Sequence, residues 1–313
     1  MKTIERSVGD IAFISGQKFY LELPKDYWYR QLFLYLSGNL VIGTAAATAL
    51  KLESPLSLIK NIDLVLNGKD VIKSMPFNAF YQWAKVRHGT APTLTAPGLT
   101  VATHPFAAGA VIDLGLADGT SKVDTMLKAK GASTLQLGID WETTTAGLVT
   151  PDATTTLAIT SGNLHVCTNE AYNVDDKIVF PVNREYSLSM PLSASGIYQL
   201  KLPTGNLFWG LLIKAVDNGA LSNAVINKIT IKSGTEVFRY YSSQAALREI
   251  LKNDRGIESL STGYYLIHFT RDGLMSEALD ARLMSDLTVE FDVVFGTASK
   301  IEVYPQEIVV PRK

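Results

Sequence analysis

The sequence contains a single cysteine, Cys167, among its 313 residues. One cysteine excludes an internal disulfide, a cysteine-based zinc site and a CxxC redox motif, and it favours a reducing compartment. No apolar run approaches the roughly 18 residues that a membrane-spanning helix needs. The opening residues Met1–Arg6 contain no apolar stretch of the kind found in signal peptides, and no Asn-x-Ser/Thr sequon occurs. These absences predict a soluble protein made in a reducing compartment.

An excess of charge of one sign is also lacking. The chain has 29 Lys and Arg against 30 Asp and Glu, so its formal net charge is -1. Nucleic-acid-binding proteins normally carry a basic excess or patch, so we expect no sequence-specific nucleic-acid partner. Hydrophobic residues make up 47% and charged residues 19%. That composition is typical of a folded chain, and the length suits about two domains.

Motifs for common chemistries are missing too. The four histidines are scattered, without HExxH spacing, and no GxSxG, GxxxxGK[ST] or GxGxxG motif follows an apolar strand. Cys167 lies in the apolar run Leu164–Cys167, which predicts a small buried residue rather than a reactive thiol. We therefore expect no catalytic residue, no cofactor-binding residue and no metal-binding residue.

Paired acids are the main alternative to this view, because some two-sheet proteins are glycosidases that use two carboxylates. Glu290 and Asp292 share one face of a predicted strand, and Asp140 and Glu142 share another. The adjacent pair Asp175-Asp176 suggests structural calcium at an interface as an alternative to a polar linker. An active site rarely occurs twice in one chain, so we interpret the strand acids as a solvated face or a subunit contact.

Short alternating apolar stretches dominate what the sequence does contain. In Leu287–Phe295 the odd positions are apolar while Thr288, Glu290 and Asp292 point the other way, and Asn61–Leu66 has the same period of two. Period two is typical of strands that face a core on one side. Only Phe77–Arg87 and Ser243–Asp254 have helical spacing, so the pattern predicts a mainly antiparallel β protein.

An internal repeat with a displacement of about 167 residues relates the two halves. Its anchors are sequence pairs of similar composition: Gly38-Asn39-Leu40 with Gly205-Asn206-Leu207, Leu23-Pro24 with Met190-Pro191, Ile59–Ile62 with Ile226–Ile229, Asn67-Gly68 with Ser233-Gly234, and Gly89 with Gly256. On the helices, Phe80, Trp83 and Ala84 match Leu247, Ile250 and Leu251 as the core-facing residues. Tandem copies of one unit follow from such a repeat.

Later strands keep their order in both copies. Val111–Leu116 corresponds to Tyr264–Phe269, and Leu135–Trp141 corresponds to Leu287–Val293. We predict an N-terminal half of residues 1–174 with long loop insertions and a C-terminal half of residues 175–313. Each half has about eight strands, so the fold class is all-β, with two tandem eight-stranded jelly-roll β-sandwiches that each carry one short helix.

In this architecture the chain resembles the double jelly-roll major capsid proteins of tailless icosahedral viruses in the adenovirus–tectivirus–corticovirus lineage, especially bacteriophages with an internal membrane. The resemblance spans the whole chain and rests on the repeat, on the matched helices Phe77–Arg87 and Ser243–Asp254, and on the loops inserted in one copy. It implies a structural protein that forms pseudo-hexagonal homotrimers and then the virion shell. It also implies minor capsid and vertex proteins as partners, an underlying viral membrane, synthesis in the host cytoplasm and a final location in the virion.

Subunit contacts are the functional residues that such a protein needs. Exposed aromatic residues and the polar sides of the two helices are the candidates, because interfaces favour amphipathic side chains. They are Tyr27, Trp28, Tyr29, Gln82, Lys85, Arg87, Arg248, Glu249 and Lys252. For the aromatic run Tyr27–Tyr29, the alternative to a subunit contact is packing within the chain where a strand begins. Met1–Gly16 and Val309–Lys313 lie outside the strand pattern, and we expect them either to reach neighbouring subunits or to fray.

Two other functions fit the same fold class. One is a secreted or phage-borne glycan-active enzyme with two β-sandwich domains, and the other is a carbohydrate-binding protein of similar organisation. The first needs convergent acids and the second needs exposed aromatic residues. Neither explains why both halves carry a helix at the same point of the strand order.

Overall fold

The computed structural model describes residues 2–116, 125–255, 260–270 and 275–309. The chain divides into two units. Unit 1 consists of Met1–Leu116 with Thr125–Asn183, and unit 2 of Ala117–Asp124 with Arg184–Lys313. Strand β13 (Val182–Tyr186) contains the boundary at residue 183.

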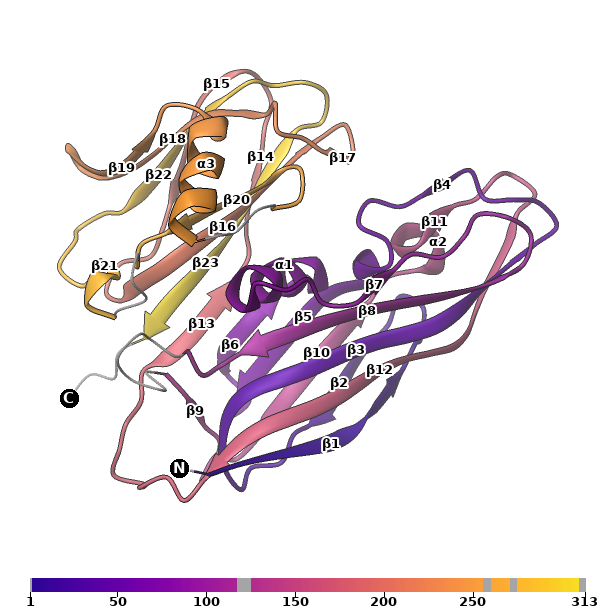
Figure 1. The fold of residues 1–313 in the computed structure, drawn as a ribbon, viewed down its shortest axis with the longest axis horizontal. Helices are drawn as coiled ribbons and strands as arrows, with labels where there is room; N and C mark the ends of the chain where they lie inside the picture. Colours follow the sequence, from indigo (N-terminus) through magenta and orange to yellow (C-terminus); the bar gives the residue numbers. More distant parts are fainter. Residues whose placement is uncertain (1, 117–124, 256–259, 271–274, 310–313) are drawn as a thin grey trace. The chain divides into compact units, whose positions relative to one another are not determined.

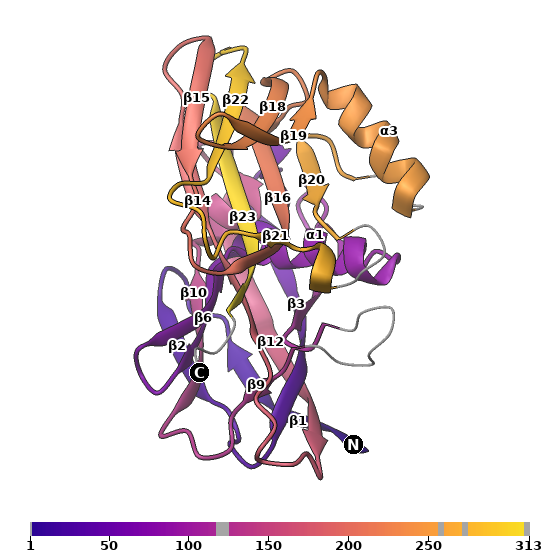
Figure 2. The same ribbon diagram turned by 90° about the vertical axis from the view of Figure 1, so that its left-hand side faces the viewer.

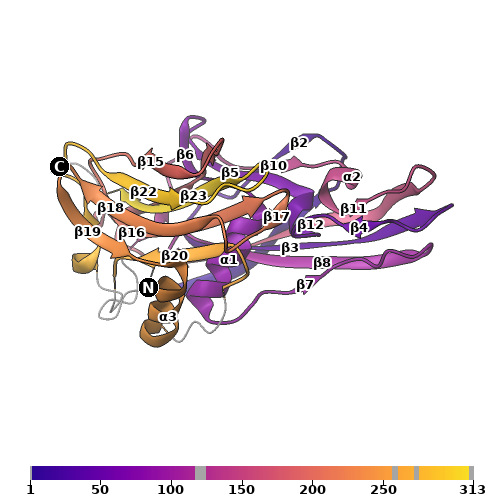
Figure 3. The same ribbon diagram turned by 90° about the horizontal axis from the view of Figure 1, so that it is seen from above.

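Unit 1 is a sandwich of two antiparallel sheets, and the long strands of the first sheet run side by side in Figures 1 and 3. The first sheet has the order β1 (Lys2–Ala12), β12 (Thr156–Tyr172), β3 (Trp28–Gly43) and β8 (Thr103–Asp113), with the short β7 (Leu94–Thr95) and β9 (Leu127–Lys128) attached. The second sheet has the order β2 (Lys18–Glu22), β10 (Leu135–Trp141), β5 (Ile59–Leu66) and β6 (Asp70–Met75). A separate short ladder pairs β4 (Ala49–Leu50) with β11 (Val149–Thr150).

Unit 2 repeats this plan, with shorter strands in its first sheet, and Figure 2 shows the strands of its second sheet side by side. The first sheet has the order β14 (Leu188–Pro191), β23 (Lys300–Val309), β16 (Leu207–Asp217) and β20 (Tyr264–His268), with β17 (Ala220–Leu221) and β21 (Leu279–Asp280) attached to β16. The second sheet has the order β15 (Gly196–Lys201), β22 (Thr288–Val293), β18 (Ile226–Ser233) and β19 (Glu236–Tyr241).

One helix occupies the same point of the strand order in each unit. Helix α1 (Phe77–His88) lies between β6 and β8, and α3 (Gln244–Arg255) lies between β19 and β20. Pro76 precedes α1, Gly89 ends it with φ of 65°, and Ser243 Oγ accepts a 3.1 Å hydrogen bond from Ala246 N at the start of α3. These three features confirm the predicted helix ends. Gly256, the glycine predicted to end α3, lies outside the described residues.

Shorter helical segments complete the described part of the chain: the 3-10 turns η1 (Leu56–Leu58) and η2 (Met275–Glu277) and the one-turn α2 (Thr144–Gly147). None of the described helices combines the length and the apolar character that crossing a membrane requires.

Alternating side chains explain both sandwiches. Leu32, Leu34 and Leu36 of β3 point inward and are buried, as are Val289 and Phe291 of β22. Full burial of one such side chain contributes roughly 1.5–3 kcal/mol, so the two cores rather than the loops stabilise the units. Both units have eight main strands in the same order, with the helix at the same place. The predicted double jelly roll is therefore confirmed.

The repeat is real, but two of its predicted anchors are wrong. The displacement of 167 holds for β5 with β18 and for α1 with α3. In β3 and β16 it is 179, because Trp28 pairs with β9 as Leu207 pairs with β21. Gly38-Asn39-Leu40 therefore lies within β3, whereas Gly205-Asn206-Leu207 lies at the start of β16, so the two tripeptides are not equivalent. From the start of β3 to the start of β5, unit 1 has 12 more residues than unit 2 has from the start of β16 to the start of β18. A comparison at a constant displacement cannot detect such an insertion.

The second wrong anchor is Leu23-Pro24, which matches Leu202-Pro203 rather than Met190-Pro191. Leu23 N donates to Leu135 O at 2.8 Å, and Leu202 N donates to Leu287 O at the same distance. Both leucines leave the equivalent strands β2 and β15 and are buried. An apolar residue followed by proline occurs at both Met190-Pro191 and Leu202-Pro203. The sequence comparison therefore chose a pair twelve residues before the equivalent one.

The N-terminal segment was also predicted wrongly. Residues Lys2–Ala12 form β1, the outer strand of the first sheet, and pair with β12 over their whole length. Their many polar side chains hid the strand, because an edge strand has little apolar periodicity to detect. For the C-terminal segment, residues 310–313 lie outside the described residues, and Val309 ends β23.

Candidate functional site

The aromatic run that was predicted to contact other subunits lies largely inside unit 1. Trp28 and Tyr29 begin β3 and are buried, whereas Tyr27 is half-buried. Tyr29 Oη donates a 2.6 Å hydrogen bond to Pro24 O, and burial raises its pKa far above the ordinary value. Packing at the entrance to the strand therefore accounts for Trp28 and Tyr29, and only Tyr27 has surface left for a partner.

The polar side of α1 is covered within the chain. Gln82 is only 3% exposed, so the prediction that it lies on the surface is wrong. Lys85 and Arg87 are half-buried. The Arg87 guanidinium lies 4.6 Å from the centre of the Trp83 ring, which is a favourable cation–π distance.

On α3 the corresponding side chains are more accessible. Glu249 and Lys252 are exposed, as predicted. Arg248 is half-buried and donates to Asn223 Oδ1 at 2.9 Å and to two main-chain oxygens, Ser261 O at 3.0 Å and Tyr264 O at 3.1 Å. It holds α3 against the start of β20, so its role within unit 2 is to position the helix.

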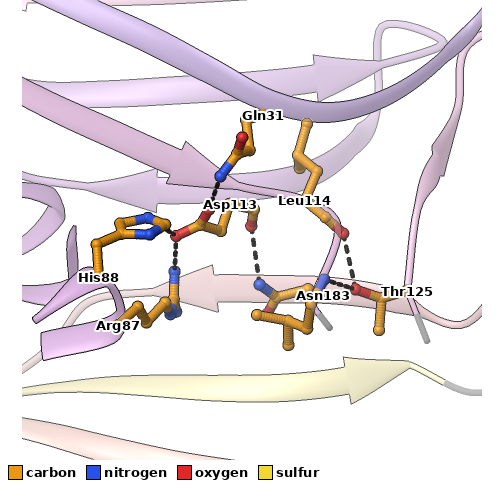
Figure 4. Close-up of polar contacts among 8 residues, drawn as sticks. Gln31, Arg87, His88, Asp113, Leu114, Thr125 and Asn183 are labelled. Atoms are coloured by element: carbon orange, nitrogen blue, oxygen red, sulfur yellow. Dashed lines mark hydrogen bonds and ion pairs between the residues drawn. The ribbon is translucent and has the colours of Figure 1, made fainter. Parts of the chain in front are cut away.

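A buried carboxylate at the end of β8 organises the C-terminal end of α1 (Figure 4). Asp113 is 2% exposed and accepts from Gln31 Nε2 at 2.8 Å and from Arg87 at 3.2 Å, while His88 Nε2 lies at 3.2 Å. Burial alone would raise the pKa of Asp113, but the hydrogen bond with His88 and the charge of Arg87 outweigh it and lower the pKa to about 2. The same hydrogen bond raises the pKa of His88.

Main-chain groups next to Asp113 are also held by side chains. Thr125 Oγ1 donates to Leu114 O at 2.8 Å and accepts from Leu116 N at 2.9 Å, and Asn183 Nδ2 donates to Asp113 O at 2.9 Å (Figure 4). Together these contacts hold the C-terminal end of α1, the end of β8 and Asn183, the last residue of unit 1, close to one another. Asp113, Arg87 and His88 all have partners within the protein, so we interpret the cluster as structural.

A second buried carboxylate occurs at equivalent places in both units. Glu170 of β12 and Glu307 of β23 both lie beside a bulge in the adjoining strand, where Tyr29 and Phe208 are their partners. Arg6 donates to Glu170 through two nitrogens, at 2.9 and 2.6 Å, whereas Glu307 accepts from Asn206 Nδ2 at 2.7 Å. Unit 1 thus uses a hydrogen-bonded ion pair, whereas unit 2 uses a neutral amide together with a longer ion pair of 4.0 Å between Arg184 and Glu307.

Three of the acids that suggested a glycosidase, Asp140, Glu290 and Asp292, stand on the outer faces of the second sheets, whereas Glu142 follows the end of β10, so the prediction that it shares a strand face with Asp140 is wrong. Asp140 and Asp292 are equivalent, as predicted, because their neighbours Ile139 and Phe291 pair with Ile62 and Ile229. Glu290 accepts from Lys232 Nζ at 2.7 Å and from Gln199 Nε2 at 2.9 Å.

In the predicted linker, Asp176 accepts from Lys130 Nζ at 2.6 Å. Within the described ranges, no group of three or more His, Cys, Asp or Glu is placed to hold a metal ion.

Sequence reasoning missed the outer face of the first sheet of unit 1. Phe33, Tyr35, Val111 and Cys167 point away from the core and are half-buried or exposed, so the prediction of a fully buried Cys167 is wrong. A detectable signal was present, since residues 32–36 of β3 are all apolar or aromatic. A strand without alternation is typical of a strand that is covered on both faces.

Comparison with protein-family models gives no match, and no curated protein sequence is significantly similar. Solved structures do match. The STIV major capsid protein has a TM-score of 0.81 and 13% identity, covering 99% of this chain and 98% of that chain. A chain of Sulfolobus Turreted Icosahedral Virus gives 0.80 and 13%, covering 99% and 92%. The major capsid protein of bacteriophage PM2 gives 0.68 and 15%, covering 99% of both chains.

These neighbours are capsid proteins rather than enzymes, and at such identities the likeness concerns the fold. Coverage of nearly the full length on both sides means that the whole chain, and not one domain of it, takes part in the match. The chain thus has the double jelly-roll fold found in the major capsid proteins of icosahedral viruses.

Proposed function

We propose that this chain is the major capsid protein of a tailless icosahedral virus and has no catalytic role. The observation that carries the proposal is the duplication itself: two eight-stranded jelly rolls with one strand order and one helix position in a single chain. Three such chains around a threefold axis present six similar units, which approximates the sixfold outline that tiles a shell. The capsid identity of the structural neighbours supports the same role.

The finer assignments belong to this proposal. The assembling unit is a homotrimer, and the virion shell is its final location. We infer a prokaryotic host, with bacteriophage and archaeal virus both represented among the neighbours by bacteriophage PM2 and the Sulfolobus virus. Minor capsid and vertex proteins, and a viral membrane beneath the shell, are the further partners that we propose for it.

A near-neutral charge is consistent with a protein that packs against copies of itself. The formal net charge of -1 keeps long-range repulsion between subunits small. The rival glycan-active function has weaker support, since Glu290 is engaged by Lys232 and Gln199 on an outer sheet face.

Negative-stain electron microscopy of the purified protein tests the proposal. We expect class averages of particles with a hexagonal outline and threefold symmetry, together with larger arrays or shells at high protein concentration. Single, unassociated molecules at every concentration would contradict it, and hydrolysis of a glycan by the same preparation would favour the rival function.

A further inference from the structure

The first sheets of the two units have outer faces that can be compared residue by residue. The matched bulges fix the correspondence, because Tyr29 with Glu170 is equivalent to Phe208 with Glu307. Counting along the paired strands gives two outward rows in each unit. In unit 1 they are Cys167, Phe33 and Val111, then His165, Tyr35 and Gly109; in unit 2 they are Tyr304, Leu212 and Leu266, then Glu302, Lys214 and Tyr264.

The two faces differ sharply in exposure. Leu212, Leu266 and Tyr304 of unit 2 are fully buried. In unit 1 the equivalent row of Phe33, Val111 and Cys167 is only half-buried, and Tyr35 in the next row is 44% exposed. The outer face of unit 1 is therefore apolar and aromatic but open, whereas outward strand positions that face water are normally polar.

The helices differ in the opposite sense. Trp83 of α1 is 1% exposed, and Asn78 and Gln82 on other sides of the helix are buried as well. In α3 the residue equivalent to Trp83 is Ile250, which is 44% exposed, so its predicted place in the core is wrong. Ala245 and Glu249, the equivalents of Asn78 and Gln82, are exposed too. Unit 1 has a covered helix and an open sheet face, and unit 2 has the reverse.

We propose that the exposed side of α3 in one copy of the chain docks on the open outer face of the first sheet of unit 1 in a second copy. Ile250 is the contact on the helix, and the Phe33–Tyr35 segment with Val111 is the contact on the sheet. This inference rests on the proposed capsid function and names the surfaces through which copies associate.

A second copy is the occupant that the structure favours, because the chain already contains a covered version of each surface. The positions equivalent to Ile250 and Phe33, namely Trp83 and Leu212, are both enclosed within one chain. One chain therefore leaves one helix side and one sheet face unpaired, on different units. A contact between unlike surfaces is heterologous, and repeated around an axis it closes into a ring rather than stopping at a dimer.

The chemistry of the two surfaces is compatible. The sheet contributes aromatic rings and small residues, which offer large contact area with little loss of side-chain entropy. The helix contributes the exposed side chain of Ile250, while Ala245, Glu249 and Lys252 lie together on the neighbouring part of its exposed surface, because successive residues are about 100° apart around a helix. On the sheet face, Asp10 Oδ1 lies 2.7 Å from His165 Nδ1, so a polar pair stands beside the apolar row of Phe33 and Val111.

Charge introduced on the helix tests the proposal. We expect Ile250→Glu to reduce the trimer fraction at least tenfold at micromolar concentration, with unchanged circular dichroism and unchanged melting of the unassembled protein. Leu283→Glu is the matched control, since Leu283 is 98% exposed on the same unit and lies outside both surfaces. Tyr35→Glu on the sheet should reproduce the effect of Ile250→Glu.

Cross-linking tests the pairing of the two surfaces. Cys167 is the only native cysteine, so Ile250→Cys gives each chain one thiol on either surface. A short bismaleimide should then link chains into dimers and covalent trimers, whereas the wild type and Leu283→Cys should stay unlinked. A trimeric wild type whose assembly is unaffected by Ile250→Glu and which gives no ladder would overturn this inference alone. A wild type that never associates would overturn the capsid proposal as well.

Discussion

Unit 1 and unit 2 share a strand order but differ in which of two surfaces is buried, the helix or the outer face of the first sheet. In unit 1 the helix α1 is covered on several sides, with Trp83 and Gln82 buried, while the outer face around Tyr35 is open. In unit 2 the outer face around Leu212 is fully buried, while Ile250 of α3 is exposed. A symmetric duplication has thus become a chain with two unlike free surfaces. In the assembly that we propose, this difference lets each copy use one surface toward one neighbour and the other surface toward the next, as a closed ring requires.

The largest expected effect compares the two equivalent helix positions. Trp83→Ala should lower the free energy of unfolding by about 4 kcal/mol, because it leaves a large cavity in a packed region. Ile250→Ala should cost less than about 1 kcal/mol in the unassembled protein, since the side chain is partly in water. Urea denaturation followed by circular dichroism measures both. Equal losses would mean that the two helices are packed alike.

The buried glutamates give the next largest contrast. Glu170→Gln should destabilise the protein by about 3 kcal/mol, because the Arg6 pair loses its charge while the site stays buried. Glu307→Gln should cost only about 1 kcal/mol, since the new side-chain oxygen can still accept from Asn206. Asp26→Asn is the control, because Asp26 touches the same Arg6 at 3.5 Å but is exposed to solvent. A large loss in Asp26→Asn would assign the stability to Arg6 rather than to the buried carboxylate.

Acid should act on unit 1 through Asp113. Its folded pKa of about 2 lies below the ordinary 3.8, so its contribution is complete above about pH 4 and is lost as the pH falls toward 2. The contribution is about 2 kcal/mol, and Asp113→Asn should remove it at pH 6 and flatten the acid limb. The raised pKa of His88 acts in the other direction, so its share is present below about pH 6.5 and is lost as the pH rises through the folded pKa.

Unit 2 provides the comparison for this titration, because His268 occupies the position equivalent to Asp113 and its Nδ1 lies 2.9 Å from Thr270 Oγ1. Urea midpoints of the wild type and Asp113→Asn between pH 2 and pH 8 separate the contribution of the carboxylate. Parallel curves over the whole range would contradict the assignment of the acid limb to Asp113.

The smallest effects should come from the outer faces of the second sheets. Lys232→Met removes the 2.7 Å pair with Glu290 in unit 2, and Lys18→Met removes the 2.5 Å pair with Asp63 in unit 1. Each should change the free energy of unfolding by less than about 1 kcal/mol, because water and salt screen partly exposed pairs. Differential scanning calorimetry at low and high salt is the measurement. A loss of more than about 1 kcal/mol in either variant would contradict the view that water screens the ion pairs on these outer sheet faces.

The periodicity of the sequence predicts the sandwich strands and both helices. Each of these elements has one apolar side that faces a core, which gives the strands a period of two and the helices a period of about 3.6. Val289 and Phe291 of β22, and Phe80 and Leu247 of the helices, are buried as their spacing indicates. Periodicity also identifies the equivalent acids Asp140 and Asp292.

What a pattern cannot reveal is whether a surface is covered a second time by another part of the chain. Gln82 has the chemistry of a surface residue and is buried, whereas Ile250 has the chemistry of a core residue and is exposed. The polar β1 strand was hidden for a related reason, since its place is set by pairing with β12 and not by an apolar face. Among the candidate contact residues, Glu249 and Lys252 keep their predicted exposure, and their role in assembly stays a prediction.

The native mass of the purified protein, measured by light scattering over a range of concentrations, tests the central claim most directly. We predict a species of three times 34.1 kDa, with larger assemblies built from it as the concentration rises. A constant mass of 34.1 kDa at every concentration would contradict the account of a self-assembling capsid subunit.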